Sequence, residues 1–556
     1  ARFKHLYSIW QKMKIKENTF FITTPIYYTN WIPHIGHAYS SVICDVIARY
    51  QKINGKKVKF STWVDENSQK AILKALEMWM EIMPYLDMMA EKHKAVWDGL
   101  NLKYTDFIRT TEKRHHKLVR EVLKKCFDKW DIYQAEYEWM YCIWCEAFKK
   151  DDDLIELNWK KVCPDHLTEP QKLKEKNWFF RLSKYENDLK NLYNNKSNFV
   201  IPDNRFNEVK AFVERWLDDF SISRETNKFG IKLPFDETQV TYVWFDALFN
   251  YVTVCSYPDN WLNDMEFWPA DLHVVAKDII RFHAIYWPAM LMSAWYELPK
   301  QILTTGYFTV DGQKISKSLW NAIDPVEFIE KYSKDLMILY MLSSINIGQD
   351  GDFDQKQAIL TYNAKLANNL WNLVNRVVVL SLKLDWVLER WLFFDISSKI
   401  NIKSFTYFWI DENKDWFEYL KTLSKNIYEN FNIFFEENYR FLNKYNLKWA
   451  LDLSFNFLDI LNDFTTQKEP WKMIKDETKQ DETREVLYTI AEWLRQVGLA
   501  LYPFFPEKMS EMFVKIWLSD YEKRLEDWEL QNLIKETPVF EIKEKWKNLF
   551  ERIDLG

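Results

Sequence analysis

The sequence predicts an α/β protein whose parallel sheet is interrupted by an inserted segment and followed by an all-helical region. Three observations lead to this prediction. β-Branched and aromatic runs at Phe20–Thr24 and Val58–Val64 flank an amphipathic stretch at 36–50, which gives a strand–helix–strand unit. Strand-like runs return at 240–245, 273–276 and 301–305. From Pro325 onward, apolar residues recur at helical spacing.

Composition narrows the class of protein. The 556 residues suggest three to four domains at about 150 residues each. A hydrophobic content of 47%, a charged content of 28% and a net charge of −6 are typical of a globular protein. No apolar run reaches the ~18 residues of a membrane span, and residues 1–16 lack an apolar signal core. Six cysteines suggest no disulfide framework, so we expect a protein of the reducing cytoplasm.

The first motif is His34-Ile35-Gly36-His37, where the loop after the first strand enters the first helix. Helix N-termini favour anions, because free backbone N–H groups and the helix dipole point there. Two imidazoles in this place can donate hydrogen bonds to phosphate oxygens, and Gly36 lets a flat base approach the backbone. In isolation, a chance pair of loop histidines would be the better interpretation.

The second motif is Lys314-Ile315-Ser316-Lys317-Ser318, in a loop that follows a predicted strand. Two lysines with interleaved serines can bind a polyphosphate. Alone, this would read as a basic surface loop. Together, and in this order around a split parallel fold, the two motifs resemble the signatures of class I aminoacyl-tRNA synthetases, which bind ATP on a Rossmann-type sheet.

Within that class the chain is most similar to the methionyl-tRNA synthetase family. The resemblance runs from about residue 18 to about 515, and it rests further on the stretches 23–28, 242–247, 277–279, 282–283 and 311–314. It implies a Rossmann catalytic domain split by a zinc-binding connective insertion, then an anticodon-binding helical bundle. The expected units are an N-terminal extension (1–16), the two catalytic halves (17–126 and 236–325), the insertion (127–235), a stem-contact region (326–362) and the bundle (363–556).

The resemblance also implies site residues. His34, His37, Lys314 and Lys317 would be catalytic; with them, Gly36, Asp278 and Ser316 would bind ATP. Asp65 would pair with the α-ammonium group of the amino acid, a charge-assisted contact. Aromatic and apolar residues would enclose the methionine side chain, since sulfur–ring contacts are favourable: Ile26, Tyr28, Trp244, Tyr251, Ile279 and His283. Without the motifs, plain core aromatics and a solvated strand-end carboxylate would be the alternatives.

Two chelating pairs predict one structural zinc ion. Cys142 and Cys145 are separated by two residues, as are Cys163 and His166. Three thiolates and one imidazole make a closed tetrahedral site with no open position for catalysis. The alternative is a set of free thiols.

Three residues of the helical region match those with which the family reads the methionine anticodon. Asn372 and Arg376 are four residues apart and share a helix face, and Trp471 stands at a helix start. Loop bases of RNA are stacked on aromatic side chains and hydrogen-bonded at their edges. A capping Asn, a surface Arg and a core Trp are the alternatives.

The expected function is ATP-dependent activation of L-methionine, with Mg²⁺ on the ATP, and transfer to initiator and elongator methionine tRNAs. One alternative is a sister synthetase for another apolar amino acid; however, an insertion of about 110 residues is small for the editing domain that such enzymes often need. The other is a degenerate synthetase that only binds tRNA. The chain ends soon after the bundle, without the dimerising domain of some relatives, so we expect a monomer.

Some positions depart from the family pattern. Asn67 and Ser68 replace the usual His and Gly after the Asp-Glu pair, and Ala276 replaces a common glycine. Trp63 and Trp320 also stand where the family usually has glycine. These differences concern the shape of the pocket more than the placement of the catalytic groups.

Glycine and tryptophan are both abnormal in number. Glycine averages about 7% of residues, which predicts about 39; only 10 are present, beside 28 tryptophans. Tryptophan occurs where glycine is expected, at Trp63, Trp139, Trp320 and Trp371. We therefore hypothesise that many tryptophans are glycine in the natural protein, through a gene whose UGA codons mean glycine. A truly tryptophan-rich protein is the alternative.

Overall fold

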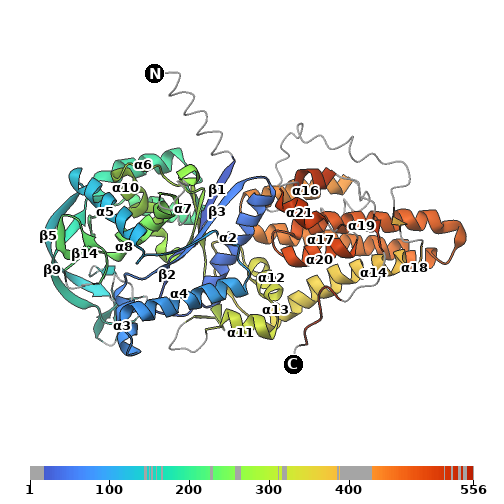
Figure 1. Cartoon of the computed structure of the whole chain (residues 1–556), viewed down its shortest axis with the longest axis horizontal. Coiled ribbons are helices and arrows are strands. Elements are labelled where there is room, and N and C mark those ends of the chain that lie inside the picture. The colour runs from blue at the N-terminus through green and yellow to red at the C-terminus, as the bar shows by residue number, and fades with distance from the viewer. Residues whose placement is uncertain are drawn as a thin grey trace, which may run out of the picture.

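The molecule has a sheet-containing half and a helical half, side by side along its long axis (Figure 1). The computed structural model describes residues 18–142, 147–149, 151, 154–157, 159–164, 167–225, 229–256, 265–310, 312–315, 322–384, 387–388, 429–516, 518, 520–527, 530–535, 540–542 and 548–554.

A seven-stranded sheet forms the centre of the first half, and all of its strand pairs are parallel. Its order is β10–β16–β15–β1–β3, with β2 and β4 also pairing with β3. The strands are β1 (Thr19–Thr23), β2 (Tyr27–Tyr28), β3 (Lys57–Asp65), β4 (Asp106–Arg109), β10 (Val200–Ile201), β15 (Leu272–Ala276) and β16 (Gln301–Thr305). The predicted parallel sheet is confirmed.

Strand β1 lies at the topological switch point, where the order in which strands are added to the sheet reverses. From β1 the chain crosses through α2 (Ile35–Ile53) to β3 on one side, while β15 pairs with β1 on the other side. Ligands of such sheets bind in the crevice beyond the carboxyl ends of the strands at this switch point. The helices around the sheet include α3 (Gln69–Glu77), α4 (Ile82–Gly99), α5 (Lys113–Asp128) and α10 (Trp287–Ser293).

The segment between the two catalytic halves is built mainly of antiparallel strands. The long pair β5 (Ile132–Cys142) and β9 (Gln171–Phe180) lies at the end of the molecule opposite the helical half (Figure 1). The segment also returns to the central sheet, because it supplies the edge strand β10. Its other elements are β6 (Ala147–Lys149), β7 (Ile155–Leu157), β8 (Lys160–Val162), η2 (Leu182–Tyr185), α6 (Glu186–Asn195), α7 (Asp203–Val213), β11 (Phe220–Ser221), β12 (Ser223–Arg224) and β13 (Lys232–Leu233).

One predicted strand is wrong in part. Strand β14 (Asp236–Thr241) ends before the aromatic run, and Tyr242 is the N-cap of a short helix, α8 (Val243–Asp246). The helical turns η3 (Ala247–Phe249) and α9 (Asn250–Ser256) continue from it. The aromatic residues read as a strand because they are buried on all sides, a pattern that does not separate a short strand from a buried helix.

From α11 onward the chain is mainly helical, and a three-stranded sheet, β18–β17–β19, lies at the junction with the preceding part. One continuous helical run consists of α13 (Gln355–Tyr362), η8 (Asn363–Trp371) and α14 (Asn372–Ser381). The other helices are α11 (Pro325–Lys331), α12 (Lys334–Ser344), α16 (Glu429–Asn443), α17 (Leu447–Lys468), α18 (Pro470–Met473), η9 (Glu477–Lys479), α19 (Gln480–Leu501), α20 (Pro506–Lys515), α21 (Tyr521–Glu526) and α22 (Leu530–Lys535). The short strands are β17 (Phe308–Val310), β18 (Gln313–Lys314), β19 (Gly351–Asp352), β20 (Val387–Leu388) and β21 (Phe540–Glu541).

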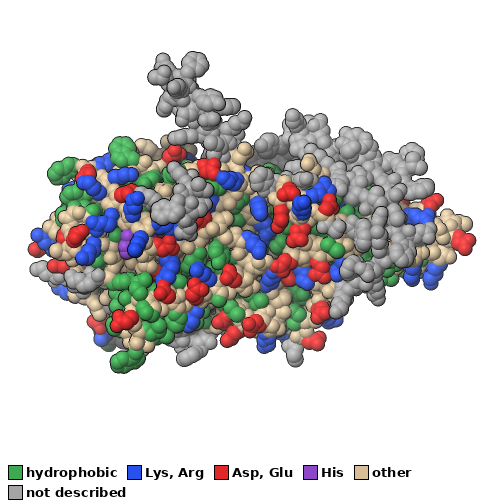
Figure 2. Space-filling view, viewed as in Figure 1, with side chains coloured by type: hydrophobic (Ala, Val, Ile, Leu, Met, Phe, Trp, Pro, Cys, Tyr) green, Lys and Arg blue, Asp and Glu red, His purple; other side chains and the backbone are tan. Residues whose placement is uncertain are grey.

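The two halves share one hydrophobic core, which runs from β1 and α2 into α17 and α19. Arg49 of α2 fixes the junction by donating hydrogen bonds to Asp45 and to the carbonyl of Pro503. None of the helices in the described ranges combines the length and apolarity needed to span a bilayer. On the face shown in Figure 2, Lys and Arg side chains alternate with Asp and Glu, which matches the small net charge.

Four fully buried histidines of the sheet-containing half predict acid sensitivity. Burial lowers the pKa of His93 to about 4, of His115 to about 3 and of His283 to about 4, and holds that of His273 well below its usual value. As pH falls below about 6.5, the unfolded chain takes up protons that the folded chain refuses. We predict that the free energy of unfolding decreases from pH 6.5 to 4, by up to about 3 kcal/mol each for His93, His115 and His283, with a further decrease from His273.

The measurement is the midpoint of urea unfolding at half-unit pH intervals from 7.5 to 4. A midpoint that stays constant over this range would contradict the buried, neutral state of these histidines.

Candidate active site

The first turn of α2 lies beyond the carboxyl end of β1 and is closed by the histidines of the first motif. His34 is the N-cap: its Nδ1 atom accepts a hydrogen bond from the Gly36 N–H at 3.0 Å. His37 occupies the third helical position, and its Nδ1 atom accepts from the His34 N–H at 3.1 Å. This reciprocal arrangement is a capping box, in which two imidazoles take the places that Ser or Thr and Glu usually hold.

The cap fixes the protonation of both rings. Because each Nδ1 atom accepts a hydrogen bond, each neutral ring carries its proton on Nε2. Burial lowers the pKa of His34 to about 4, and burial together with the neighbouring His34 and His93 holds the pKa of His37 well below its usual value. Both side chains remain partly exposed. At neutral pH they are uncharged donors, with Nε2–H groups available to an anion.

Gly36 is required by the same cap. A Cβ atom at this position would meet the His34 ring at 2.9 Å from Cε1 and 3.1 Å from Nδ1. Any side chain would therefore displace the ring that accepts the Gly36 N–H. This reason for glycine comes from the helix itself, and it is additional to the approach of a nucleotide base expected from the sequence.

Asp65 ends β3 at the same edge of the sheet. It pairs in register with Tyr28 of β2, and its side chain is completely buried. The two following residues are anchored: the Glu66 carboxylate accepts hydrogen bonds from Arg109, at 2.8 Å from Nε, and from Thr111. The position of the Asp65 carboxylate is therefore set by strand pairing on one side and by this anchored segment on the other.

Asn67 links this segment to the second catalytic half. Its amide Nδ2 donates to Asp246 Oδ2 at 3.0 Å and to the Thr110 carbonyl at 3.3 Å. Asp246 ends α8, the helix that carries Trp244. The sequence showed Asn67 only as a departure from the family pattern, and the structure gives this residue the role of holding Asp65 and Trp244 in fixed relation.

The predicted methionine-pocket residues gather beside Asp65. The Tyr28 and Trp244 rings meet edge to face at 6.4 Å between centroids, and Tyr251 Oη lies 2.9 Å from His283 Nε2. His283 Nδ1 lies 3.0 Å from the Ile279 carbonyl, so this ring donates from Nδ1 and accepts the Tyr251 hydroxyl at Nε2. Ile26 and Ile279 belong to the same apolar cluster.

Phe282 contacts the predicted pocket, although it is not among the residues predicted for it from the sequence. Its ring is stacked on Trp244 at 3.6 Å between centroids and with 3° between planes. The signal was present, since Phe282 immediately precedes His283 in a stretch that resembles the family. The stacking of Phe282 on Trp244 depends on how the chain brings these two residues together, which residue types alone do not reveal.

The second motif is described in part. The backbone of Lys314 belongs to β18, opposite Thr309 of β17, whereas Ser316, Lys317 and Trp320 lie outside the described residues. A hydrogen bond of 3.2 Å from the Ile35 N–H to the Ile323 carbonyl joins the start of α2 to the chain that follows this loop. Asp278 is exposed and follows directly after β15 in η5 (Lys277–Ile279).

Two of the four predicted zinc ligands are described. Cys142 ends β5 and pairs in register with Ala147, and Cys163 follows β8. The chain after Cys163 is held by two hydrogen bonds. The Cys163 N–H donates to the Thr168 carbonyl at 2.9 Å, and the Leu167 N–H donates to the Cys163 carbonyl at 2.8 Å. Cys145 and His166 fall outside the described residues, within which no group of three metal-ligating side chains occurs.

The residues predicted to bind the anticodon lie in the helical half. Asn372 and Arg376 are exposed, one turn apart on α14, and Trp471 is partly buried in the first turn of α18. Helices α14 and α18 both pack against α19.

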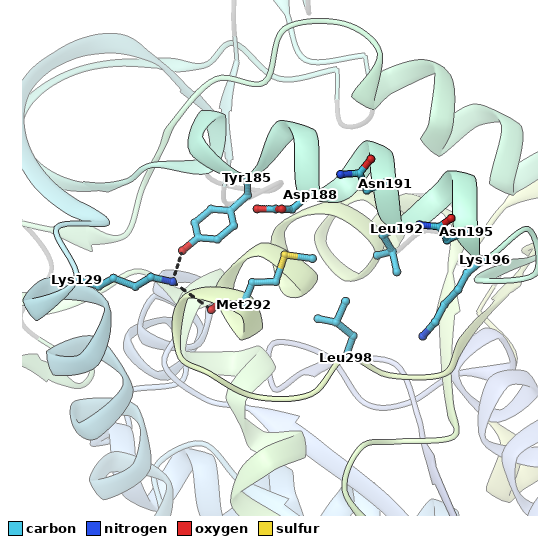
Figure 3. Close-up of a pocket in the computed structure, with 9 residues that line it drawn as sticks. All are labelled: Lys129, Tyr185, Asp188, Asn191, Leu192, Asn195, Lys196, Met292 and Leu298. Carbon is cyan, nitrogen blue, oxygen red and sulfur yellow. Dashed lines mark hydrogen bonds between the residues drawn. The ribbon is translucent and has the colours of Figure 1, made fainter.

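A separate surface hollow of about 510 Å³ lies between α6 and the chain after α10 (Figure 3). Lys129 lies at one side of it and donates to Tyr185 Oη at 3.0 Å and to the Met292 carbonyl at 3.3 Å. None of the residues predicted for methionine or ATP lines this hollow. The candidate active site is therefore the carboxyl edge of the sheet.

Comparison with known proteins agrees with this location. A sequence model of the family described as tRNA synthetases class I (M) matches residues 20–378. The methionine–tRNA ligase of Thermotoga maritima is 36% identical over 513 residues, which cover 92% of this chain and 77% of that protein. The methionine–tRNA ligase of Rickettsia conorii is 37% identical over 506 residues, covering 91% and 94%.

A solved structure, Mycobacterium tuberculosis methionyl-tRNA synthetase in complex with methionyl-adenylate, is similar with a TM-score of 0.86 and 29% identity. The similarity covers 96% of this chain and 100% of that one. With the capped α2, the parallel sheet and the helical half all in place, the chain belongs to the family tRNA synthetases class I (M).

Proposed function

We infer that the chain is a methionine–tRNA ligase, which activates L-methionine with ATP and transfers it to methionine tRNA through methionyl-adenylate. The observation that carries this inference is similarity over nine-tenths of the chain, at 36–37% identity, to proteins with that activity. The site geometry supports it, because a carboxylate, an aromatic pocket and an anion-binding helix start meet at one sheet edge.

In the first step the methionine carboxylate attacks the α-phosphorus of ATP. The new bond joins a carboxylate oxygen to phosphorus, and the bond to the bridging oxygen breaks to release pyrophosphate. No general base is needed, since the carboxylate is already ionised, and positioning supplies much of the rate. Mg²⁺ accompanies the ATP phosphates. In the second step the 3′-terminal hydroxyl of the tRNA attacks the methionyl carbonyl, and AMP leaves.

The capped histidines act on the phosphate chain as neutral donors. In this proposal, His34 and His37 direct Nε2–H groups at oxygens whose charge grows in the transition state. Their rings are held before ATP arrives, because the Nδ1 atoms are engaged by the backbone of α2. Lys314 and Lys317 supply positive charge from the opposite side, Gly36 and Ser316 border the nucleotide, and Asp278 lies near its ribose.

Methionine is recognised at both ends. Asp65 pairs with the α-ammonium group, and burial strengthens this charge pair because water does not screen it. Tyr28, Trp244, Tyr251 and His283 surround the thioether, with Ile26 and Ile279 beside it. The buried His283 is neutral, so the pocket presents an uncharged, polarisable surface suited to sulfur.

The insertion is proposed to hold one structural zinc ion. Cys142 and Cys163 are buried thiols: Cys142 ends β5 opposite Ala147, and Cys163 begins a turn closed by the Leu167 N–H. Paired zinc ligands commonly stand at such strand ends and turns. With Cys145 and His166 these two thiols supply three sulfur ligands and one nitrogen ligand. The metal would order this end of the insertion and supply no chemistry to the reaction.

The helical half is proposed to read the anticodon of initiator and elongator methionine tRNAs. On one face of α14, Asn372 exposes an amide that can donate and accept hydrogen bonds, and Arg376 exposes a cation. Trp471 offers a ring on which a base can stack.

A monomer and a cytoplasmic location remain predictions. Sedimentation checks the first, and cell fractionation checks the second.

Amino-acid-dependent exchange of pyrophosphate into ATP tests the function. We expect exchange with methionine alone. Exchange with another amino acid would indicate a sister synthetase, and no exchange with any would indicate a tRNA-binding protein without activity. The assay uses both the Trp63 chain and its Trp63→Gly form, since an indole next to the pocket would itself weaken methionine binding.

Replacing Asp65 by alanine should abolish methionine activation. The ammonium group would then enter a buried site without its counter-charge, which costs several kcal/mol, so kcat/KM for exchange should fall by at least ~10²-fold. Asp98→Ala, which removes an exposed carboxylate of α4, is the matched control and should leave exchange unchanged. Near-normal exchange in a folded Asp65→Ala protein would disprove the assignment.

Lys317→Ala should lower kcat for exchange by about 10²-fold while changing the KM for methionine little, because the contact strengthens in the transition state. The control is Lys331→Ala, which removes an exposed lysine of α11. An effect confined to KM would contradict this role for Lys317.

Metal analysis of protein purified without chelator should find one zinc per chain. Cys163→Ala should remove most of it, whereas Cys126→Ala, at a buried thiol outside the proposed ligand set, should retain it. Loss of zinc should reduce tRNA charging more than pyrophosphate exchange, since the insertion lies far from the phosphate site in sequence. Zinc-free protein, or zinc retained in Cys163→Ala, would reject the site.

A further inference from the structure

Tryptophan is concentrated at left-handed backbone positions. Among the described residues, eight non-glycine residues have a φ between 48° and 64°, and four of these are Trp79, Trp130, Trp159 and Trp295. Tryptophan makes up 28 of the 556 residues, so four of eight is far above its share. A bulky side chain in this conformation is strained, whereas glycine adopts it freely.

Three of these tryptophans end helices in the same way. Trp79 follows α3, and hydrogen bonds run from the Trp79 N–H to Leu76 at 3.1 Å and from the Met80 N–H to Ala75 at 2.9 Å. This double closure is the Schellman motif, whose left-handed residue is usually glycine.

The same double closure occurs at the end of α5, and the outer of its two hydrogen bonds occurs at the end of α10. The Trp130 N–H donates to Phe127 at 2.9 Å and the Asp131 N–H to Cys126 at 3.0 Å. After α10, the Tyr296 N–H donates to Leu291 at 2.9 Å, around Trp295.

Other helices of the chain show which residues this motif ordinarily takes. At the end of α2 the left-handed residue is Gly55, with closing bonds to Lys52 at 2.9 Å and from Lys56 to Gln51 at 3.1 Å. Helix α4 ends in the same way on Asn101, and α16 ends on Tyr445. The three tryptophans thus occupy the left-handed position of a recurring turn that takes Gly55 and Asn101, two residue types suited to a positive φ, and also Tyr445.

The fourth tryptophan lies in a tight hairpin. Leu157 of β7 pairs with Lys160 of β8, so the connection between the two strands is two residues long, and Trp159 is its second residue. A two-residue hairpin turn strongly favours Asn-Gly, because both turn residues need a positive φ. Trp159 has a φ of 62°.

The indoles at these four positions contribute almost nothing to packing. Their exposed fractions are 95% for Trp79, 81% for Trp130, 101% for Trp159 and 79% for Trp295. By contrast, Trp97 and Trp287 are fully buried in helices, and Trp287 Nε1 donates to His273 Nε2 at 3.2 Å. Trp371, suspected from the sequence, resembles the second group, since its φ is −66° and its indole donates to Asn548 at 3.1 Å.

Trp63 is a different case, because its indole is buried within the candidate active site. Side chains alternate along a strand, so Trp63 and Asp65 point to the same face of β3. The indole is fully buried in the cluster that holds Ile26 and Trp244, and its ring centroid lies 5.6 Å from that of Tyr251. Its Nε1 donates to the Thr24 carbonyl at 3.4 Å.

We propose that residue 63 controls whether methionine can enter the pocket, and that residues 63, 79, 130, 159 and 295 are glycine in the natural protein. The part concerning methionine rests on the proposed function. The indole packs against Tyr251 and lies on the face of β3 that carries Asp65, so it occupies volume beside both parts of the predicted methionine site. A glycine inside a strand can mark a site where a ligand approaches closely, and we propose that at position 63 this ligand is the substrate side chain.

The identity of the residues is tested by peptide mass spectrometry of the protein purified from its source cells. We expect glycine at positions 63, 79, 130, 159 and 295 and tryptophan at 97, 244 and 287. Indole mass at position 63 or at the left-handed positions would overturn the proposal, whatever the activity of the protein.

The backbone strain at the left-handed positions is tested by the unfolding temperature. The combined Trp79→Gly, Trp130→Gly, Trp159→Gly and Trp295→Gly variant should unfold at a higher temperature than the starting chain, by about 2–4 °C or more. The same four positions changed to alanine should gain less, because alanine is also strained at positive φ. Trp216→Gly, at an equally exposed position without left-handed φ, should give no gain.

An alanine variant as stable as the glycine variant would show that removal of an exposed indole, rather than relief of backbone strain, explains the effect. That result would contradict the inference for the left-handed positions.

The role of residue 63 is tested by calorimetric titration with methionine and by exchange. Trp63→Gly should bind methionine at least ~10-fold more tightly than the Trp63 chain, with Trp63→Ala between them and Trp63→Leu weaker than Trp63→Ala. Methionine affinity that is equal in the Trp63 and Trp63→Gly proteins, or lower in the latter, would overturn the role. If the glycine form instead activates another amino acid, or none, the proposed function fails, and the mass analysis still decides the identity of residue 63.

Discussion

The reciprocal cap between His34 and His37 is the interaction on which the candidate site depends. It satisfies backbone N–H groups at the start of α2 and uses the Nδ1 atom of each ring to do so. The same two hydrogen bonds therefore start the helix, fix the tautomers and direct the remaining N–H groups away from the helix backbone. Gly36 is required between the rings, because a Cβ atom there would collide with His34. Under the proposed function, the same two hydrogen bonds serve helix formation and phosphate recognition.

The parallel sheet then brings distant parts of the chain to this helix. Strand β1 pairs with β3 on one side and with β15 on the other, so Asp65 and the turn that carries Asp278 reach the same edge. Side-chain bonds refine this placement: Asn67 connects the end of β3 to Asp246 across 179 residues of sequence. The insertion between the two halves does not disturb the sheet, because it leaves from α5 and returns through β14 while adding β10 at the edge.

Much of the fold follows from local patterns. The strand predicted at 301–305 has these bounds in the structure, and those predicted at 20–24, 58–64 and 273–276 differ by about one residue, because buried parallel strands are continuous apolar runs. The secondary structure of the run 240–245 does not follow from its residue pattern, because burial on all sides hides the change from strand to helix at Tyr242. The capping roles of His34 and His37, the stacking of Phe282 on Trp244 and the Asn67–Asp246 bond depend on backbone geometry and on contacts distant in sequence, which residue types alone do not fix. The glycine deficit was visible in the composition, but only φ angles separate Trp79 from Trp97.

The central claim is that this sheet edge joins methionine to the α-phosphate of ATP. Single-turnover formation of the aminoacyl-adenylate, in the absence of tRNA and with each standard amino acid in turn, measures that step directly by mass spectrometry of the quenched reaction. For the natural protein the account predicts methionyl-adenylate and equimolar pyrophosphate from methionine, and no adenylate from leucine, isoleucine or valine. Adenylate formed from another amino acid in preference to methionine, or from none, would contradict it.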